Sequence, residues 1–83
     1  RFDIIYIDGS HYSLDVYKDL INANKLLKKN GILLIDDFLL DVSIRSGYSK
    51  YYEDVMGGVF MFLKKNYNFK FLYIGHQLIL QKM

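Results

Sequence analysis

The chain has 83 residues, which is enough for one small domain or part of one. Its formal net charge of +2 at pH 7 is too small to indicate nucleic-acid binding, and no apolar run approaches the roughly 20 residues that cross a bilayer. It contains no cysteine, which excludes a disulfide framework, a thiolate nucleophile and a thiolate zinc site, and which is compatible with a location in a reducing cytoplasm.

The first predicted element is a buried strand over residues 2–8, which form a short apolar run rich in isoleucine. A helix is predicted over residues 13–28, with Ser13 as its N-cap. Its buried face consists of four apolar residues at helical spacing, Val16, Leu20, Ala23 and Leu27. Asn30 and Gly31 are expected to end the helix, because both tolerate a left-handed backbone.

A second strand is predicted over residues 31–36. Both strands are continuous apolar runs, which is typical of central strands in a parallel sheet that is covered on both faces. The strand, helix and strand would form a right-handed crossover. Because the chain begins at Arg1, directly before a strand and without Met, we expect a piece of a longer protein.

Residues 38–51 form a long connection, and connections of this length in compact domains are often functional. A second helix is predicted over residues 52–65, where the pair Gly57 and Gly58 would permit close packing on the sheet. Its apolar residues 60–62 are compatible with a dimer contact, and therefore with a homo-oligomer. Two lysine pairs are expected to follow the two helices and to complement their dipoles: Lys28 and Lys29, and Lys64 and Lys65.

The chain closes with two predicted strands, residues 69–74 and 77–81. The two residues between them, Gly75 and His76, are typical of a tight antiparallel hairpin. His76 has no carboxylate near it in the sequence, so we interpret it as an exposed turn residue.

Two acidic segments follow the two predicted parallel strands. Asp8 and His11 come after the first strand, and Asp36 and Asp37 come after the second. The carboxyl ends of parallel strands meet at one edge of a sheet, so these side chains are expected to lie together. Asp37 would point the other way along its strand unless the chain turns there.

Carboxylates gathered at one sheet edge repel one another, and a divalent cation would relieve that repulsion. A set of oxygen ligands suits Mg²⁺, Ca²⁺ or Mn²⁺. His11 is the acid/base group of this segment that titrates near neutral pH. The structural alternative is that the aspartates are turn residues or helix caps.

These motifs resemble those of class I S-adenosylmethionine-dependent methyltransferases. Residues 2–11 (FDIIYIDGSH) and residues 31–37 (GILLIDD) are similar to the C-terminal half of that fold, in the metal-dependent O-methyltransferase subgroup with D-G-x-H and D-D motifs. The resemblance implies an α/β fold with a Rossmann-like partial sheet. Two parallel strands with a crossover helix would be followed by a helix and an antiparallel C-terminal hairpin. Residues 1–83 would be the C-terminal portion of a single methyltransferase domain.

The resemblance further implies methyl transfer from S-adenosylmethionine to the hydroxyl of a small-molecule substrate. By position, the family's metal ligands match Asp8, Asp36 and Asp37, with Mg²⁺ as the expected ion. The family's general base matches His11.

The cofactor half of the family's site is the largest departure. Asp8, Gly9 and Ser10 match a turn that passes near the cofactor in relatives. The glycine-rich loop and the acidic residue that holds the cofactor ribose have no counterpart here and are expected upstream of Arg1. These 83 residues alone are therefore not expected to bind S-adenosylmethionine well.

Other functions are weighed beside this one. A phosphoacceptor receiver domain has its aspartate pair after the first strand, whereas here the single Asp8 precedes the pair. A metal-dependent nucleotide-sugar transferase would leave residues 8–11 without a role. A noncatalytic remnant or interaction module would keep the fold without the reaction. Three residues of the long connection are candidate substrate contacts: Arg45, Tyr48 and Tyr51.

Overall fold

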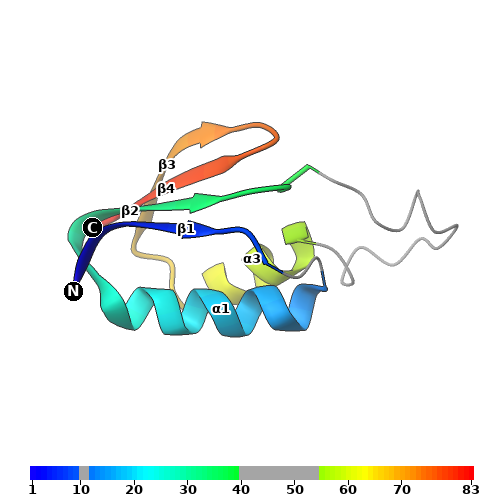
Figure 1. Cartoon of the computed structure of the whole chain (residues 1–83), viewed down its shortest axis with the longest axis horizontal. Helices are drawn as coiled ribbons and strands as arrows, with labels where there is room; N and C mark the ends of the chain where they lie inside the picture. Colours follow the sequence, from blue (N-terminus) through cyan, green and yellow to red (C-terminus); the bar gives the residue numbers. More distant parts are fainter. Residues whose placement is uncertain (10–11, 40–54) are drawn as a thin grey trace, which may run out of the picture.

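The computed structural model describes residues 1–9, 12–39 and 55–83. The elements are β1 (Phe2–Ile7), α1 (Ser13–Leu26), β2 (Leu27–Ile35), α3 (Val55–Leu63), β3 (Phe69–Ile74) and β4 (Leu78–Lys82). They form one four-stranded sheet in the order β1-β2-β4-β3, with both helices on the same side of it (Figure 1). β1 and β2 are parallel, and the hairpin of β3 and β4 adds antiparallel strands. The predicted α/β fold class is confirmed.

The end of α1 differs from the prediction. The helix ends at Leu26, and Leu27, whose side chain is fully buried, is already extended. Asn30 has the left-handed backbone expected of it, with φ of 68°, but it lies inside β2. The register of β1 against β2 shifts there, because Leu27 pairs with Phe2 whereas Ile32 pairs with Ile4. The left-handed residue therefore marks an irregularity of the strand and not the helix end.

The capping of α1 differs from the prediction at both ends of the helix. Its N-cap is Tyr12, with no capping hydrogen bond from the side chain, and Ser13 is the buried first residue of the helix. Lys28 lies in β2 and does not complement the helix dipole. Instead the ammonium group of Lys82, in β4, donates hydrogen bonds to the carbonyl oxygens of Asn24 and Leu27, at 2.8 and 3.1 Å.

The hydrophobic core lies between the helices and one face of the sheet. Its buried members include the predicted face of α1 and the inward residues of three strands: Val16, Leu20, Ala23, Leu27, Leu33, Ile35, Phe69, Leu78 and Leu80. From α3 it receives Val55, Val59 and Phe62, and the rings of Phe62 and Phe69 are 5.5 Å apart. Alternation along β2 and β4 therefore sends one set of side chains into this core and the other set to the opposite face.

That opposite face is not covered by any described helix (Figure 1). The apolar side chains on it, called here the open sheet face, are Ile4, Tyr6, Ile32, Leu34, Tyr73 and Ile79. Ile4 is 60% exposed and Tyr6 49%. Within the described residues, the prediction that both parallel strands are covered on both faces is therefore wrong, and β1 is an edge strand and not a central one in the described sheet.

Gly58 of α3 packs against α1, whereas the prediction placed the glycine pair against the sheet. A Cβ on Gly58 would lie 2.5 Å from the carbonyl oxygen of Ser13 and 2.6 Å from the Cβ of Val16. No side chain fits in that space, so glycine sets how closely the helices approach. The described part of α3 begins at Val55, and the predicted residues 52–54 lie outside the described residues.

The hairpin is confirmed, with a connection of residues 75–77 between its strands. Leu78 pairs with Ile35, so the hairpin connection lies beside the carboxyl end of β2. The backbone N–H of Phe38 donates a 2.7 Å hydrogen bond to the carbonyl oxygen of His76, which attaches the connection to the chain leaving β2. Within the described residues, neither helix has the length and hydropathy required to cross a membrane.

Candidate functional site

The carboxyl ends of β1 and β2 meet as predicted. Ile7 pairs with Ile35, and the backbone N–H of Asp36 donates a 3.0 Å hydrogen bond to the carbonyl oxygen of Ile7. The chain turns immediately after this strand, because Asp37 has φ of 58°. The prediction required a turn here for the side chain of Asp37 to lie on the same side as that of Asp36, and the turn is present. The side chains of Asp37 and Asp36 are 22% and 20% exposed.

Asp36 is held in place by several donors, among them the side chain of Gln77. The hydroxyl of Tyr6 donates a 2.8 Å hydrogen bond to its Oδ2, and the backbone N–H of Asp37 donates a 3.0 Å bond to its Oδ1. The Tyr6 hydrogen bond is the main reason why the pKa of Asp36 lies below its ordinary value. The same hydrogen bond is the main reason why the pKa of Tyr6 is raised to about 12. The site therefore holds Asp36 as a carboxylate and Tyr6 as a neutral phenol.

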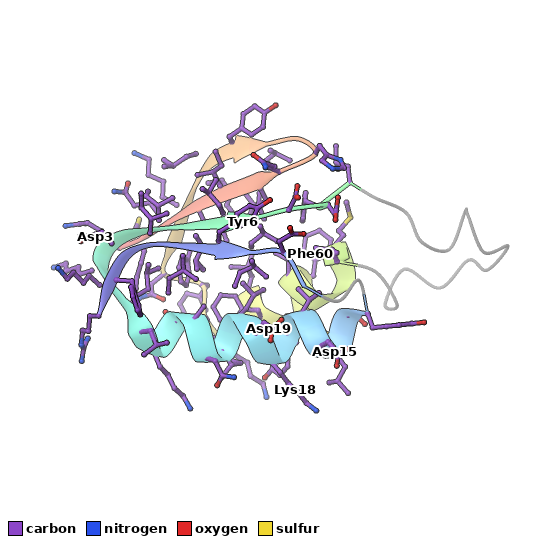
Figure 2. All side chains as sticks on the ribbon, viewed as in Figure 1. Asp3, Tyr6, Asp15, Lys18, Asp19 and Phe60 are labelled. Atoms are coloured by element: carbon purple, nitrogen blue, oxygen red, sulfur yellow. The ribbon has the colours of Figure 1, made fainter. Side chains whose placement is uncertain are left out.

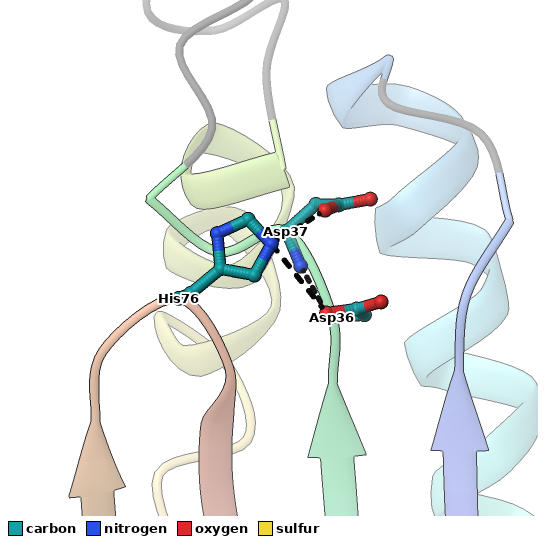
Figure 3. A group of neighbouring side chains, drawn as sticks. All are labelled: Asp36, Asp37 and His76. Atoms are coloured by element: carbon teal, nitrogen blue, oxygen red, sulfur yellow. Dashed lines mark hydrogen bonds and ion pairs between the residues drawn. The ribbon is translucent and has the colours of Figure 1, made fainter.

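His76 is the residue that sequence reasoning missed. It is exposed on a turn, as predicted, with 63% of its side chain accessible. Its Nε2 nevertheless lies 2.9 Å from Oδ1 of Asp37 and 3.8 Å from Oδ1 of Asp36 (Figure 3). The signal that could have found it is the pairing of β4 with β2, because that pairing brings the hairpin connection to the end of β2.

Asp8 lies at the margin of this group. It lines one small depression together with Asp36 and Asp37. Among the described residues, the cluster whose potential ligand atoms all lie within 4.8 Å of one another consists of Asp36, Asp37 and His76, and Asp8 is not in it. The structure thus brings two of the three predicted metal ligands into contact distance and places the third beside them.

The remaining predicted site residues are described only in part. Gly9 follows Asp8, and a Cβ on it would lie 3.3 Å from Oδ2 of Asp19 in α1, so the turn is tightly packed against that helix. Ser10 and His11 lie outside the described residues, as do the three candidate substrate contacts of residues 45–51.

A separate groove of about 450 Å³ lies between the free edge of β1 and α1, and its lining includes Ile4, Tyr6, Asn22 and Leu26. Its walls are mostly apolar, and it contains none of the carboxylates that end β1 and β2. We therefore assign the chemistry to the strand ends and interpret this groove as part of the β1 edge, which pairs with no further strand among the described residues.

The cluster of Asp36, Asp37 and His76 has two possible chemical roles, which depend on the protonation of His76. As a protonated imidazolium, His76 would form an ion pair with Asp37 and offset the negative charge of the two carboxylates. As a neutral imidazole, it would offer a nitrogen ligand beside two carboxylate oxygens, which together form a donor set for a divalent cation.

Comparison with known proteins bears on which chemistry this edge serves. Residues 1–38 match a family model described as a methyltransferase domain. The matched segment runs through β1, α1 and β2 and includes Asp8, Asp36 and Asp37. No curated protein matches the chain. The family match and the partial Rossmann-like sheet support a methyltransferase-like fragment.

Proposed function

We propose that this chain is the C-terminal part of an S-adenosylmethionine-dependent methyltransferase domain that methylates a hydroxyl group of a small molecule. The observation that carries the proposal is the family match over residues 1–38, whose two strands end in the acidic residues at one sheet edge. The open sheet face and the free edge of β1 supply further support, because both are apolar surfaces of the kind that another part of a larger domain would cover.

The metal part of the proposal assigns a divalent cation to Asp8, Asp36 and Asp37. The donors fit such an ion, because Asp36 and Asp37 are neighbouring carboxylates and Asp8 lines the same depression. When bound, the cation would act as a Lewis acid that lowers the pKa of the substrate hydroxyl.

The chain's own residues would orient the reactants and accept the proton. Tyr6 holds Asp36 charged and fixes its orientation through the 2.8 Å hydrogen bond. In the proposal, His11 accepts the proton of the substrate hydroxyl as general base. Gly9 and Ser10 would line the path of the cofactor, so that its methyl group and the attacking oxygen are held in line.

The proposal is tested by methyl transfer in the longer protein that carries this segment. His11→Ala is expected to lower kcat by at least about 100-fold, because it removes a general base. Asp8→Asn is expected to lower activity by about 10-fold to 100-fold, because it weakens the hold on the cation. The matched control is Asp3→Asn, since Asp3 is 82% exposed and lies at the start of β1, away from the site (Figure 2). Undiminished methyl transfer in both site variants would overturn the assignment.

A separate experiment tests the proposal that cofactor binding requires a segment outside these 83 residues. The cofactor-binding loop is proposed to lie upstream, so titration of these 83 residues with S-adenosylmethionine is expected to show weak binding or none. Tight binding by this chain alone would contradict that part of the proposal. Isothermal titration calorimetry on the chain and on the longer protein, side by side, makes the comparison.

A further inference from the structure

We propose that His76 is a metal ligand, and that Asp36, Asp37 and His76 together bind a divalent transition-metal ion through two carboxylates and one imidazole. This differs from the oxygen-only Mg²⁺ site that the family resemblance implies. It rests on the proposed function only in placing a cation at Asp36 and Asp37.

The spacing of the potential ligand atoms carries the proposal. Nitrogen and oxygen ligands lie about 2.0–2.2 Å from a first-row divalent ion, so two ligands of one ion are separated by about 3 Å at a right angle and about 3.5 Å at a tetrahedral angle. Nε2 of His76 lies 2.9 Å from Oδ1 of Asp37 and 3.8 Å from Oδ1 of Asp36. The three potential ligand atoms all lie within 4.8 Å of one another, so one ion could contact them after side-chain rotation.

The position of the imidazole follows from the fold and does not depend on an ion. The backbone of His76 accepts the hydrogen bond from Phe38, and Leu78, two residues later, pairs with Ile35. Two chain segments thus converge, one from the end of β2 and one from the hairpin connection (Figure 3). The imidazole comes from a segment that is distant in sequence from the two adjacent aspartates. An ion pair with His76 would require only one carboxylate, whereas the fold places two carboxylates beside the imidazole.

The hydrogen bonds around Asp36 orient its carboxylate for this role. Tyr6 donates to Oδ2, and Oδ1, the oxygen nearer to the imidazole, accepts the backbone N–H of Asp37 and has a second lone pair for an ion. Metal-bound carboxylates are usually held by such outer donors, and loss of one typically costs 10-fold to 100-fold in affinity. Tyr6 is therefore an outer partner of the proposed site.

The nitrogen ligand determines which ions bind well. Imidazole suits Zn²⁺, Ni²⁺ and Fe²⁺, whereas Mg²⁺ favours oxygen ligands and retains several waters. Two carboxylates and one neutral imidazole also balance the charge of a divalent ion. Three protein ligands leave a coordination position for water or a substrate oxygen, as in catalytic zinc sites.

The experiment measures metal binding to metal-free protein by calorimetry, with Zn²⁺, Mn²⁺ and Mg²⁺ as separate probes. We expect Zn²⁺ to bind more tightly than Mn²⁺, and Mn²⁺ more tightly than Mg²⁺. His76→Gln keeps a side-chain N–H donor for Asp37 but removes the imidazole, so it is expected to weaken Zn²⁺ at least about 10-fold and Mg²⁺ by less than about 2-fold. The matched control is Asp3→Asn, which neutralises an exposed carboxylate at the start of β1, away from the strand ends, and is expected to leave Zn²⁺ affinity in place.

A second measurement does not depend on the variants folding. In the unaltered protein, Zn²⁺ is expected to shift the ring ¹⁵N NMR signal of Nε2 of His76, because that nitrogen would bind the ion directly. If His76→Gln binds Zn²⁺ as tightly as the unaltered chain, or if the Nε2 signal of His76 does not shift when Zn²⁺ is added, the inference is wrong and an oxygen-only site can still stand. If no probe ion binds, this inference and the metal part of the proposed function both fail. If binding depends on His76 but the longer protein transfers no methyl group, only the proposed function fails.

Discussion

At the residue scale, the contact between Tyr6 and Asp36 makes a pH-dependent contribution to stability. The pKa of Asp36 is lowered from its ordinary value of 3.8. The contribution of Asp36 to folding stability is therefore present above pH 3.8 and is lost as the pH falls through the lower pKa of the folded state. The pKa of Tyr6 is raised from 10.0 to about 12. The contribution of Tyr6 to folding stability is therefore present below pH 10 and is lost as the pH rises toward 12. The hydrogen bond therefore contributes most between these two limits.

Tyr6→Phe is expected to raise the pKa of Asp36 toward its ordinary value in metal-free protein. The stability difference between this variant and the unaltered chain should be largest near neutral pH and should shrink below pH 3.8 and above pH 10. Carboxyl NMR titration and denaturant unfolding across pH make the two measurements. Tyr67→Phe is the control, because Tyr67 is 82% exposed. An unshifted Asp36 in Tyr6→Phe would show that the phenol does not set its charge.

The candidate site could be predicted from the sequence as far as Asp8, Asp36 and Asp37, because each follows a recognisable apolar strand. The place of His76 could not, because it depends on β4 lying next to β2, and residues far apart in sequence give no local signal of that pairing. The turn at Asp37 was also beyond local reasoning, since a non-glycine residue with φ of 58° is uncommon.

At the element scale, Gly58 sets the distance between α1 and α3. Gly58→Ala would gain about 1 kcal/mol in helix propensity, but its Cβ would lie 2.5 Å from a backbone carbonyl of α1. Because backbone cannot move aside as a flexible side chain does, we expect a net loss of about 1–3 kcal/mol. Denaturant unfolding measures it, with Lys18→Ala on the exposed side of α1 expected to stay within about 0.5 kcal/mol. A stabilised Gly58→Ala variant would mean that the helices separate at little cost.

Lys82 connects the last strand to the end of α1. Lys82→Met keeps the aliphatic stem but removes two charged hydrogen bonds to the carbonyl oxygens of Asn24 and Leu27. We expect a loss of about 1.5–3 kcal/mol, as is typical of hydrogen bonds to charged groups. Lys70→Met, at an exposed position of β3, serves as the control in thermal unfolding. Equal effects of the two substitutions would argue against a capping role for Lys82.

At the scale of the whole molecule, element order and fold class followed from the sequence because apolar spacing distinguishes strands from helices. All four residues of the predicted helix face are buried, although Leu27 lies in β2 and not in α1. The end of α1 was placed too late, because Asn30 and Gly31 carry the same left-handed signal in a strand irregularity as at a helix end. The coverage of β1 was also wrong, because a continuous apolar strand indicates burial without indicating which segment provides it.

The open sheet face therefore leads to a prediction about self-association of this chain. Apolar side chains beside an unpaired edge strand favour contact between molecules. Ile4 is 60% exposed on β1, so Ile4→Lys is expected to reduce concentration-dependent association while changing stability by less than about 1 kcal/mol. Leu14→Lys adds the same charge at a 53% exposed position of α1, away from this face, and is expected to reduce it less. Sedimentation velocity over a concentration series distinguishes the two, and equal effects would assign the change to net charge alone.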